Sequence, residues 1–280
     1  MDAIALFNQT ALECSKLITK RYSTSFTLGI RALDKKYHLP IYGIYGFVRY
    51  ADEIVDTFHD YDKKSLLKHF REETQKAIDE KISFNPVLHA FQLIVNQYAI
   101  EYALIEAFLD SMEMDLEKTD YTPEGYRRYI YGSAEVVGLM CLRVFCEGND
   151  TVYQSLKEPA CKLGSAFQKV NFLRDMKSDY DERGRTYFPG LNYEKFNQTV
   201  KREIEADIAI DFSDALEGIK KLPAGARLGV YLAYKYYLKL FIKIRNLSPE
   251  TIASTRIRIP NAIKLSLLLK TYCGVKLGLD

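Results

Sequence analysis

Four aspartates in two separate pairs have the spacing of a metal site. Asp52 and Asp56 lie in YADEIVD, and Asp175 and Asp179 lie in NFLRDMKSD. If both segments are helical, each pair shares one helix face, about 6 Å apart along the axis. Clustered carboxylates repel one another unless hard cations such as Mg²⁺ lie between them, and protein-bound Mg²⁺ commonly completes its shell with phosphate oxygens. The two pairs therefore favour a diphosphate substrate.

Basic and amide residues flank both pairs at helical spacing. Arg49 lies one turn before the first pair, and Gln168, Asn171 and Arg174 precede the second. A guanidinium can contact phosphate oxygens through two parallel hydrogen bonds. Taken alone, each pair is equally compatible with a surface helix carrying intrahelical salt bridges. The neighbouring aromatic residues favour a half-buried site instead, and these are Tyr42, Tyr45, Phe47, Phe167 and Phe172.

Two further aspartate pairs have the same spacing without such neighbours. They are Asp56 with Asp60 and Asp207 with Asp211. The second lies in KREIEADIAIDFSD, whose charges are typical of a solvated helix face. We interpret both pairs as incidental.

The composition limits the class of protein. The 280 residues are 48% hydrophobic and carry a net charge of +2, which is too balanced for a nucleic-acid-binding surface. The five cysteines show no C-x-x-C spacing, which favours a reducing cytoplasm over a disulfide or zinc framework. The first segment does not resemble a signal peptide, and charges interrupt every apolar stretch. We expect a cytoplasmic protein that is soluble or rests on a membrane surface.

Helical periodicity dominates the chain and predicts one all-α domain spanning residues 1–280. No alternating strand pairs or internal repeats interrupt it. Pro86, Pro123 and Pro260 stand where first-turn prolines are typical. The expected helices run near 3–20, 37–58, 62–80, 86–97, 99–117, 123–147, 151–179, 198–220, 225–246 and 260–273.

Five glycines fall inside these expected helices, where each costs up to about 1 kcal/mol of helix propensity. Close helix packing is one explanation, and an open tunnel for a long ligand is another. Both can hold at once. The residues are Gly43, Gly46, Gly132, Gly138 and Gly164.

Four segments together resemble the squalene and phytoene synthase family in order and spacing, over nearly the whole chain. They are YSTSF (22–26), YGFVRYADEIVD (45–56), YIYGSAEVVGLM (129–140) and AFQKVNFLRDMKSDYDERGRTYFP (166–189). The resemblance implies a class I isoprenoid synthase helical bundle around a central cavity. Within the family, the segments are most similar to bacterial phytoene synthases. These enzymes join two geranylgeranyl diphosphates head to head through a cyclopropyl (prephytoene) diphosphate, the first committed step of carotenoid biosynthesis.

The resemblance also implies roles for individual residues. Asp52, Asp56, Asp175, Asp179 and Asn171 would hold Mg²⁺, or Mn²⁺ in its place, against diphosphate. Gln168, Arg49 and Arg174 would lie beside them, and Ser23 and Ser25 would cap a diphosphate, although serine there also suits simple helix capping. Lys264, Arg256 or Arg258 would supply a last phosphate contact. Tyr129 and Tyr237 would lie near the substrate. The expected chamber walls are Phe26, Tyr45, Tyr129, Val136, Val137, Leu139, Met140 and Tyr237, for which an ordinary core position is the alternative.

Other readings stay open on the sequence. The same scaffold could use farnesyl diphosphate to make squalene, dehydrosqualene or hydroxysqualene. A non-catalytic helical interaction module is a rival of another class, and it predicts no Mg²⁺ dependence. The ladder Lys235, Lys239 and Lys243 could face an anionic membrane or simply be solvated. Substrate chain length and oligomeric state are not determined by these patterns.

Overall fold

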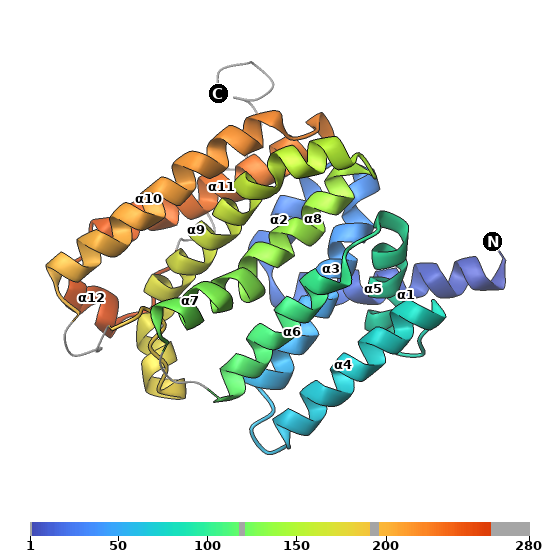
Figure 1. The fold of residues 1–280 in the computed structure, drawn as a ribbon, viewed down its shortest axis with the longest axis horizontal. Helices are drawn as coiled ribbons and strands as arrows, with labels where there is room; N and C mark the ends of the chain where they lie inside the picture. The colour runs from blue at the N-terminus through green and yellow to red at the C-terminus, as the bar shows by residue number, and fades with distance from the viewer. Residues whose placement is uncertain (1, 118–120, 191–195, 259–280) are drawn as a thin grey trace.

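The regular elements are helices throughout the described part of the chain, as predicted (Figure 1). The computed structural model describes residues 2–117, 121–190 and 196–258. The elements in order are α1 (Ala3–Tyr22), α2 (Thr24–Arg31), α3 (Lys35–Asp56), α4 (Lys63–Glu80), α5 (Pro86–Tyr98), α6 (Tyr102–Glu117), α7 (Pro123–Ile130), the π-helix η1 (Tyr131–Glu135), α8 (Val136–Cys146), α9 (Asp150–Arg183), α10 (Gln198–Lys221), α11 (Ala224–Arg245) and α12 (Pro249–Ser254).

Side-chain caps define most helix starts. A side-chain oxygen accepts a hydrogen bond from a first-turn backbone N–H, which satisfies a donor that the helix itself leaves unpaired. Pro86 and Pro123 occupy first-turn positions, as predicted. Such a cap stabilises its helix by about 1 kcal/mol. The capping residues are Asp2, Ser23, Asp62, Asn85, Thr122, Asn149, Asn197 and Ser248.

The periodicity missed the two shortest α-helices outside the long predicted segments. α2 has eight residues and α12 has six, which is too short for a 3.6-residue pattern to emerge. The segment predicted as one helix over 123–147 is α7, η1 and α8 in succession. The helix predicted near 260–273 lies outside the described residues.

The long helix α9 is the spine of the bundle. It packs against α10, α8, η1, α11 and α12, and Figure 1 shows α9, α10 and α11 running alongside one another. Aromatic rings fill the core between α3, α5 and α6, where Phe47 stacks on Phe91 with 3.9 Å between ring centroids. The helices that carry the two aspartate pairs, α3 and α9, are thus both held on several sides.

Glycines permit some of the closest helix contacts. A Cβ added at Gly46 would lie 2.7 Å from Ser15 Oγ on α1, and one added at Gly132 would lie 2.3 Å from the Ala107 carbonyl oxygen. A Cβ added at Gly43 would lie 3.1 Å from Ile94 Cγ1. The packing explanation is therefore confirmed for these three glycines.

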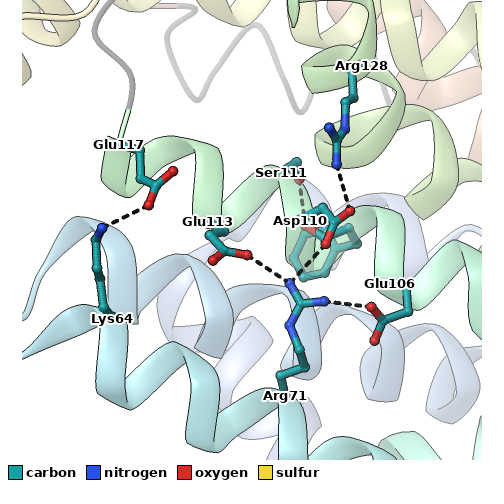
Figure 2. Close-up of polar contacts among 9 residues, drawn as sticks. Lys64, Arg71, Glu106, Asp110, Ser111, Glu113, Glu117 and Arg128 are labelled. Carbon is teal, nitrogen blue, oxygen red and sulfur yellow. Dashed lines mark hydrogen bonds and ion pairs between the residues drawn. The ribbon is translucent and has the colours of Figure 1, made fainter.

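An acidic stripe along α6 is paired with bases from its two neighbours (Figure 2). Arg71 of α4 contacts Glu106, Asp110 and Glu113 at 2.6, 3.1 and 3.4 Å. Arg128 of α7 contacts Asp110 at 3.0 Å. Because the carboxylates lie at successive turns of α6, these pairs position that helix between α4 and α7.

The prediction that Asp207 and Asp211 lie on a solvated face is wrong for Asp211. Its side chain is 2% exposed, and Lys169 and Lys162 contact it at 2.7 and 3.1 Å. α10 packs along α9, so the lysines of α9 meet a carboxylate that a single-helix pattern places in solvent. Asp207 remains 58% exposed.

One helix among the described residues, Pro123–Cys146, is long and apolar enough to cross a membrane by length and composition. Its most apolar window is 56% buried inside the bundle, as expected of a core helix.

Candidate active site

A chamber of about 620 Å³ runs between α2, α3, η1, α8, α9, α10 and α11. Polar side chains contribute to its lining on a few helical turns, including Ser23, Arg49, Asn171 and Arg174. The other lining residues are mostly apolar, such as Leu156 and Ile219. A mostly apolar cavity with a small group of polar residues is typical of a small-molecule site.

Nine residues predicted to serve the site line this chamber. They come from five different helices and the residue before α2. They are Ser23, Ser25, Phe26, Tyr45, Arg49, Val137, Asn171, Arg174 and Tyr237.

Three of the expected walls on α8 occupy the ordinary core positions that were their alternative. Val136, Leu139 and Met140 are fully buried in the core and do not line the chamber. Along α8, Val137 and Cys141 share the chamber face at a four-residue step, so their neighbours turn toward other helices. Gly138 and Gly164 do line the chamber, as the tunnel explanation expects. Both explanations hold for Gly164, because a Cβ added there would also lie 2.8 Å from the Ala134 carbonyl oxygen.

The first aspartate pair begins beside Arg49. Its guanidinium contacts Asp52 at 2.5 Å and also pairs with Glu53. The same group lies over the Tyr22 ring, 4.4 Å from the centroid. Arg49 Nε is buried without a hydrogen-bond partner, which leaves one donor at the chamber wall for a ligand.

The second pair begins beside Arg174. Its Nε lies 3.0 Å from each carboxylate oxygen of Asp175. Arg256, which follows α12, donates to Asp175 Oδ1 over 2.8 Å. Of the three basic residues predicted near the end of the chain, Arg256 therefore reaches the second motif, whereas Lys264 lies outside the described residues.

Two tyrosines connect the motifs across the chamber. Tyr45 interacts electrostatically with Arg49, Asp52 and Tyr237. Tyr237 stacks on Phe167 with 4.0 Å between centroids. Burial raises the pKa of both phenols, and for Tyr237 the neighbouring Arg174 opposes the rise. Residues from α3 and α9 thus meet at one end of the chamber.

Arg185 and Asp115 were not singled out from the sequence, yet they lie beside the far ends of both motifs. Arg185 Nη1 is 3.7 Å from Asp56 Oδ1 and 3.1 Å from Asp115 Oδ1. A small cavity is lined by Arg185 together with Asp179 and Tyr187. Burial raises the pKa of Asp115 to about 7, although the Arg185 charge opposes that shift. No motif spacing marks Asp115, since its partners come from distant segments.

Tyr129 belongs to this buried group and does not line the chamber, which is the core alternative given for it. Its hydroxyl donates to Asp115 Oδ2 over 2.9 Å, and its side chain is buried. Burial raises its pKa well above the ordinary value. Its ring packs against Tyr121, Tyr187 and Phe172.

The two serines differ in their local roles. Ser23 Oγ accepts from the Phe26 backbone N–H over 3.1 Å, so the capping alternative is observed there, although the residue also lines the chamber. Ser25 lies inside α2 and lines the chamber without capping the helix. Gln168 is half-buried on α9 and does not line the chamber.

The donors of the two motifs fit a hard cation. Asp52, Asp56, Asp175 and Asp179 supply carboxylates, and Asn171 Oδ1 is buried without a hydrogen-bond partner. All are oxygen ligands of the kind that Mg²⁺ and Mn²⁺ prefer. In the described ranges no three acidic, His or Cys side chains lie close enough together to hold an ion. Arginines contact Asp52, Asp56 and Asp175 instead, so a bound cation would replace these contacts.

The architecture is that of the all-α isoprenoid synthases. A dehydrosqualene synthase solved with a ligand superposes with a TM-score of 0.80 at 22% identity, covering 96% of this chain and 98% of that one. The squalene/phytoene synthase family model matches residues 19–262. The chain therefore belongs to the squalene/phytoene synthase family and is an enzyme that transfers prenyl groups by head-to-head condensation. This family generally depends on divalent metal ions.

Two relatives are named for different products at nearly equal identity. A 4,4'-diapophytoene synthase of Staphylococcus haemolyticus is 28% identical over 197 residues, which is 68% of this chain and 66% of the relative. A phytoene synthase of Pseudescherichia vulneris is 27% identical over 248 residues, which is 80% and 79% of the two chains. Sequence similarity alone does not determine which of the two products this enzyme makes.

Proposed function

We propose that this enzyme condenses two geranylgeranyl diphosphates head to head into phytoene. The length of the chamber carries the proposal. Leu156 and Asn171 both line it and lie fifteen residues apart on α9, which corresponds to about 22 Å of helix. An extended geranylgeranyl chain spans about 19 Å and a farnesyl chain about 14 Å, for carbon–carbon bonds of about 1.5 Å in a zigzag. The longer chain makes fuller use of the apolar wall.

The polar end would bind the diphosphate groups. Arg49 presents a guanidinium from α3 and Arg174 presents one from α9, and Ser23 and Ser25 add hydroxyls. As the allylic C–O bond breaks, these donors stabilise the negative charge that passes to the diphosphate oxygens. Arg256 would add a third guanidinium through its position on Asp175.

A divalent cation would be held by the carboxylates of Asp52, Asp56, Asp175 and Asp179 with Asn171, and it would supply Lewis-acid stabilisation of the leaving diphosphate. Gln168 is half-buried on α9, one turn before Asn171, and from there it would orient the metal ligands. Tyr129 would not touch the substrate but would help to position Asp115, to which its hydroxyl donates a hydrogen bond.

The apolar wall would protect the allylic cation. The double bond of the second substrate attacks the cation to form a cyclopropyl diphosphate with loss of a proton. Departure of the second diphosphate, ring rearrangement and loss of another proton complete the reaction. Water must be excluded at each stage, because it would capture the cation as an alcohol. Phe26, Tyr45 and Tyr237 line the chamber at its polar end, where aromatic faces stabilise positive charge.

We expect the enzyme to act in the cytoplasm with its lipid substrate drawn from a membrane surface. Lys239 and Lys243 are exposed on α11 and would face anionic headgroups. Lys243 also donates to the Arg258 carbonyl over 2.7 Å.

The test is product identity. Purified enzyme is incubated separately with geranylgeranyl and farnesyl diphosphates, with Mg²⁺, with Mn²⁺ and with excess chelator. We expect a 40-carbon hydrocarbon that requires the metal. A 30-carbon product formed in preference would instead identify the farnesyl-using sibling. Absence of metal-dependent turnover of both diphosphates would contradict the proposal.

A further inference from the structure

Gly29 is a gap in the chamber wall that the sequence patterns did not reveal. It lies in α2 and lines the chamber, and a Cβ added there would meet no atom within 4 Å. Gly138, which also lines the chamber, already has the Ala160 carbonyl oxygen 3.3 Å from its added Cβ. Gly148, Gly184 and Gly190 have open space too, but their positive φ angles explain glycine there. No such backbone requirement applies to Gly29.

The helical face shows where a side chain at this position would point. Ser25 and Phe26 lie one turn before Gly29, and Leu33 lies one turn beyond it, and all three line the chamber. Arg31 lies on the opposite side of α2 and is exposed. Position 29 is therefore near the centre of the inward face, about 6 Å of helix beyond Ser25.

The backbone of α2 cannot retreat to make room. A Cβ added at Gly229 of α11 would lie 2.4 Å from Leu33 Cδ2 and 2.9 Å from the Gly29 carbonyl oxygen. The backbones of α2 and α11 thus already approach each other closely at Gly29 and Gly229. A larger residue at position 29 must place its side chain in the chamber.

We propose that Gly29 keeps the middle of the chamber wide enough for two prenyl chains to lie side by side, which makes it a determinant of binding the second substrate molecule. Apolar carbons in contact lie about 4 Å apart, so a leucine side chain here would take up roughly the width of one chain. This inference rests on the proposed function, because only a condensing enzyme must hold two chains at once.

The test counts bound chains without requiring catalysis. Calorimetric titration with thiolo-diphosphate analogues, in which sulfur replaces the bridging oxygen, measures stoichiometry for geranylgeranyl and farnesyl chains. We expect two analogues per wild-type chain and one per Gly29→Leu chain, with at least roughly tenfold slower condensation, as overpacking of one contact implies. Arg31→Leu, with the same side chain on the outer face of α2, should bind two and condense at the wild-type rate.

Gly29→Ala is a second test variant in case the leucine variant does not fold. Its methyl group meets nothing within 4 Å, so it should keep wild-type helical circular dichroism and bind the second analogue severalfold more weakly. The inference would be overturned if folded Gly29→Leu bound two analogues at wild-type affinity. If the leucine variant does not fold, the same result for Gly29→Ala would overturn it. Binding of a single analogue by the wild type would overturn it as well. Binding of two analogues without any turnover of the natural diphosphates would count against the proposed function alone.

Discussion

Arg185 Nη1 lies 3.1 Å from Asp115 Oδ1, which pairs a guanidinium after α9 with a carboxylate inside α6. Arg185 Nη2 also donates to the Asp115 carbonyl oxygen over 2.6 Å, and Tyr129 donates to the other carboxylate oxygen. Because the same guanidinium lies 3.7 Å from Asp56, the buried carboxylate helps to determine where the first aspartate motif meets the second. The stability of this group can be tested separately from catalysis.

Removing the charge of Arg185 should destabilise the fold strongly. Arg185→Met leaves Asp115 buried without its cation, and at a pH above about 8, where the wild-type carboxyl is ionised, breaking a buried pair in this way costs up to about 3–5 kcal/mol. Urea unfolding followed by circular dichroism measures the change. Combining the variant with Asp115→Asn should recover part of the loss, since no buried charge then remains. Equal stability of wild type and Arg185→Met would show that the pair contributes nothing.

Asp115 should also make stability depend on pH. Burial raises its pKa from 3.8 to about 7, so the folded state holds the proton more tightly than the unfolded state. The resulting stabilisation is fully present below about pH 4 and is lost as the pH rises toward 7. Asp115→Asn cannot titrate. The unfolding free energy of wild type minus that of this variant should therefore fall between pH 4 and 7, and a constant difference would contradict the assignment.

Loss of one carboxylate from either motif should abolish turnover without unfolding the protein. Asp52→Asn and Asp175→Asn each remove a ligand for the proposed cation, and we expect rates lower by on the order of 10²-fold or more. The melting temperature of Asp52→Asn should stay near wild type, because the Asp52 side chain is 36% exposed and partly exposed pairs contribute only about 0–1 kcal/mol. Asp175 is 15% exposed, so circular dichroism of Asp175→Asn should confirm that it keeps the wild-type helical fold. The exposed Asp60, four residues after Asp56, gives a matched control. Asp60→Asn should remain active, and full activity in either motif variant would refute the site.

Two glycine-to-alanine substitutions should have opposite effects on stability. Gly132→Ala places its methyl 2.3 Å from the Ala107 carbonyl oxygen, and such overpacking typically costs about 1–3 kcal/mol. The added methyl of Gly29→Ala meets nothing within 4 Å, so this variant should be more stable than wild type by up to about 1 kcal/mol, the difference in helix propensity between alanine and glycine. Thermal melts of the two variants compare them directly. A Gly132→Ala variant as stable as wild type would mean that α6 and η1 can move apart freely.

Local spacing accounts for much of the site. Arg49 with Asp52 and Arg174 with Asp175 are neighbours on their own helices, so helical geometry alone brings them together. Val137 lines the chamber and Val136 lies in the core, although both were expected to be chamber walls. The sequence of one helix cannot reveal which of its apolar faces meets a cavity and which meets another helix.

The amino-acid order by itself determined the helical class, the two aspartate motifs and their arginine neighbours, since each depends on contacts within a few turns of one helix. The tertiary structure alone decided the burial of Asp211, the partnership of Asp115 with Arg185 and the open wall at Gly29. Those features join segments far apart in the chain, and their energies depend on which helices pack together and how closely. No periodicity within a single segment contains that information.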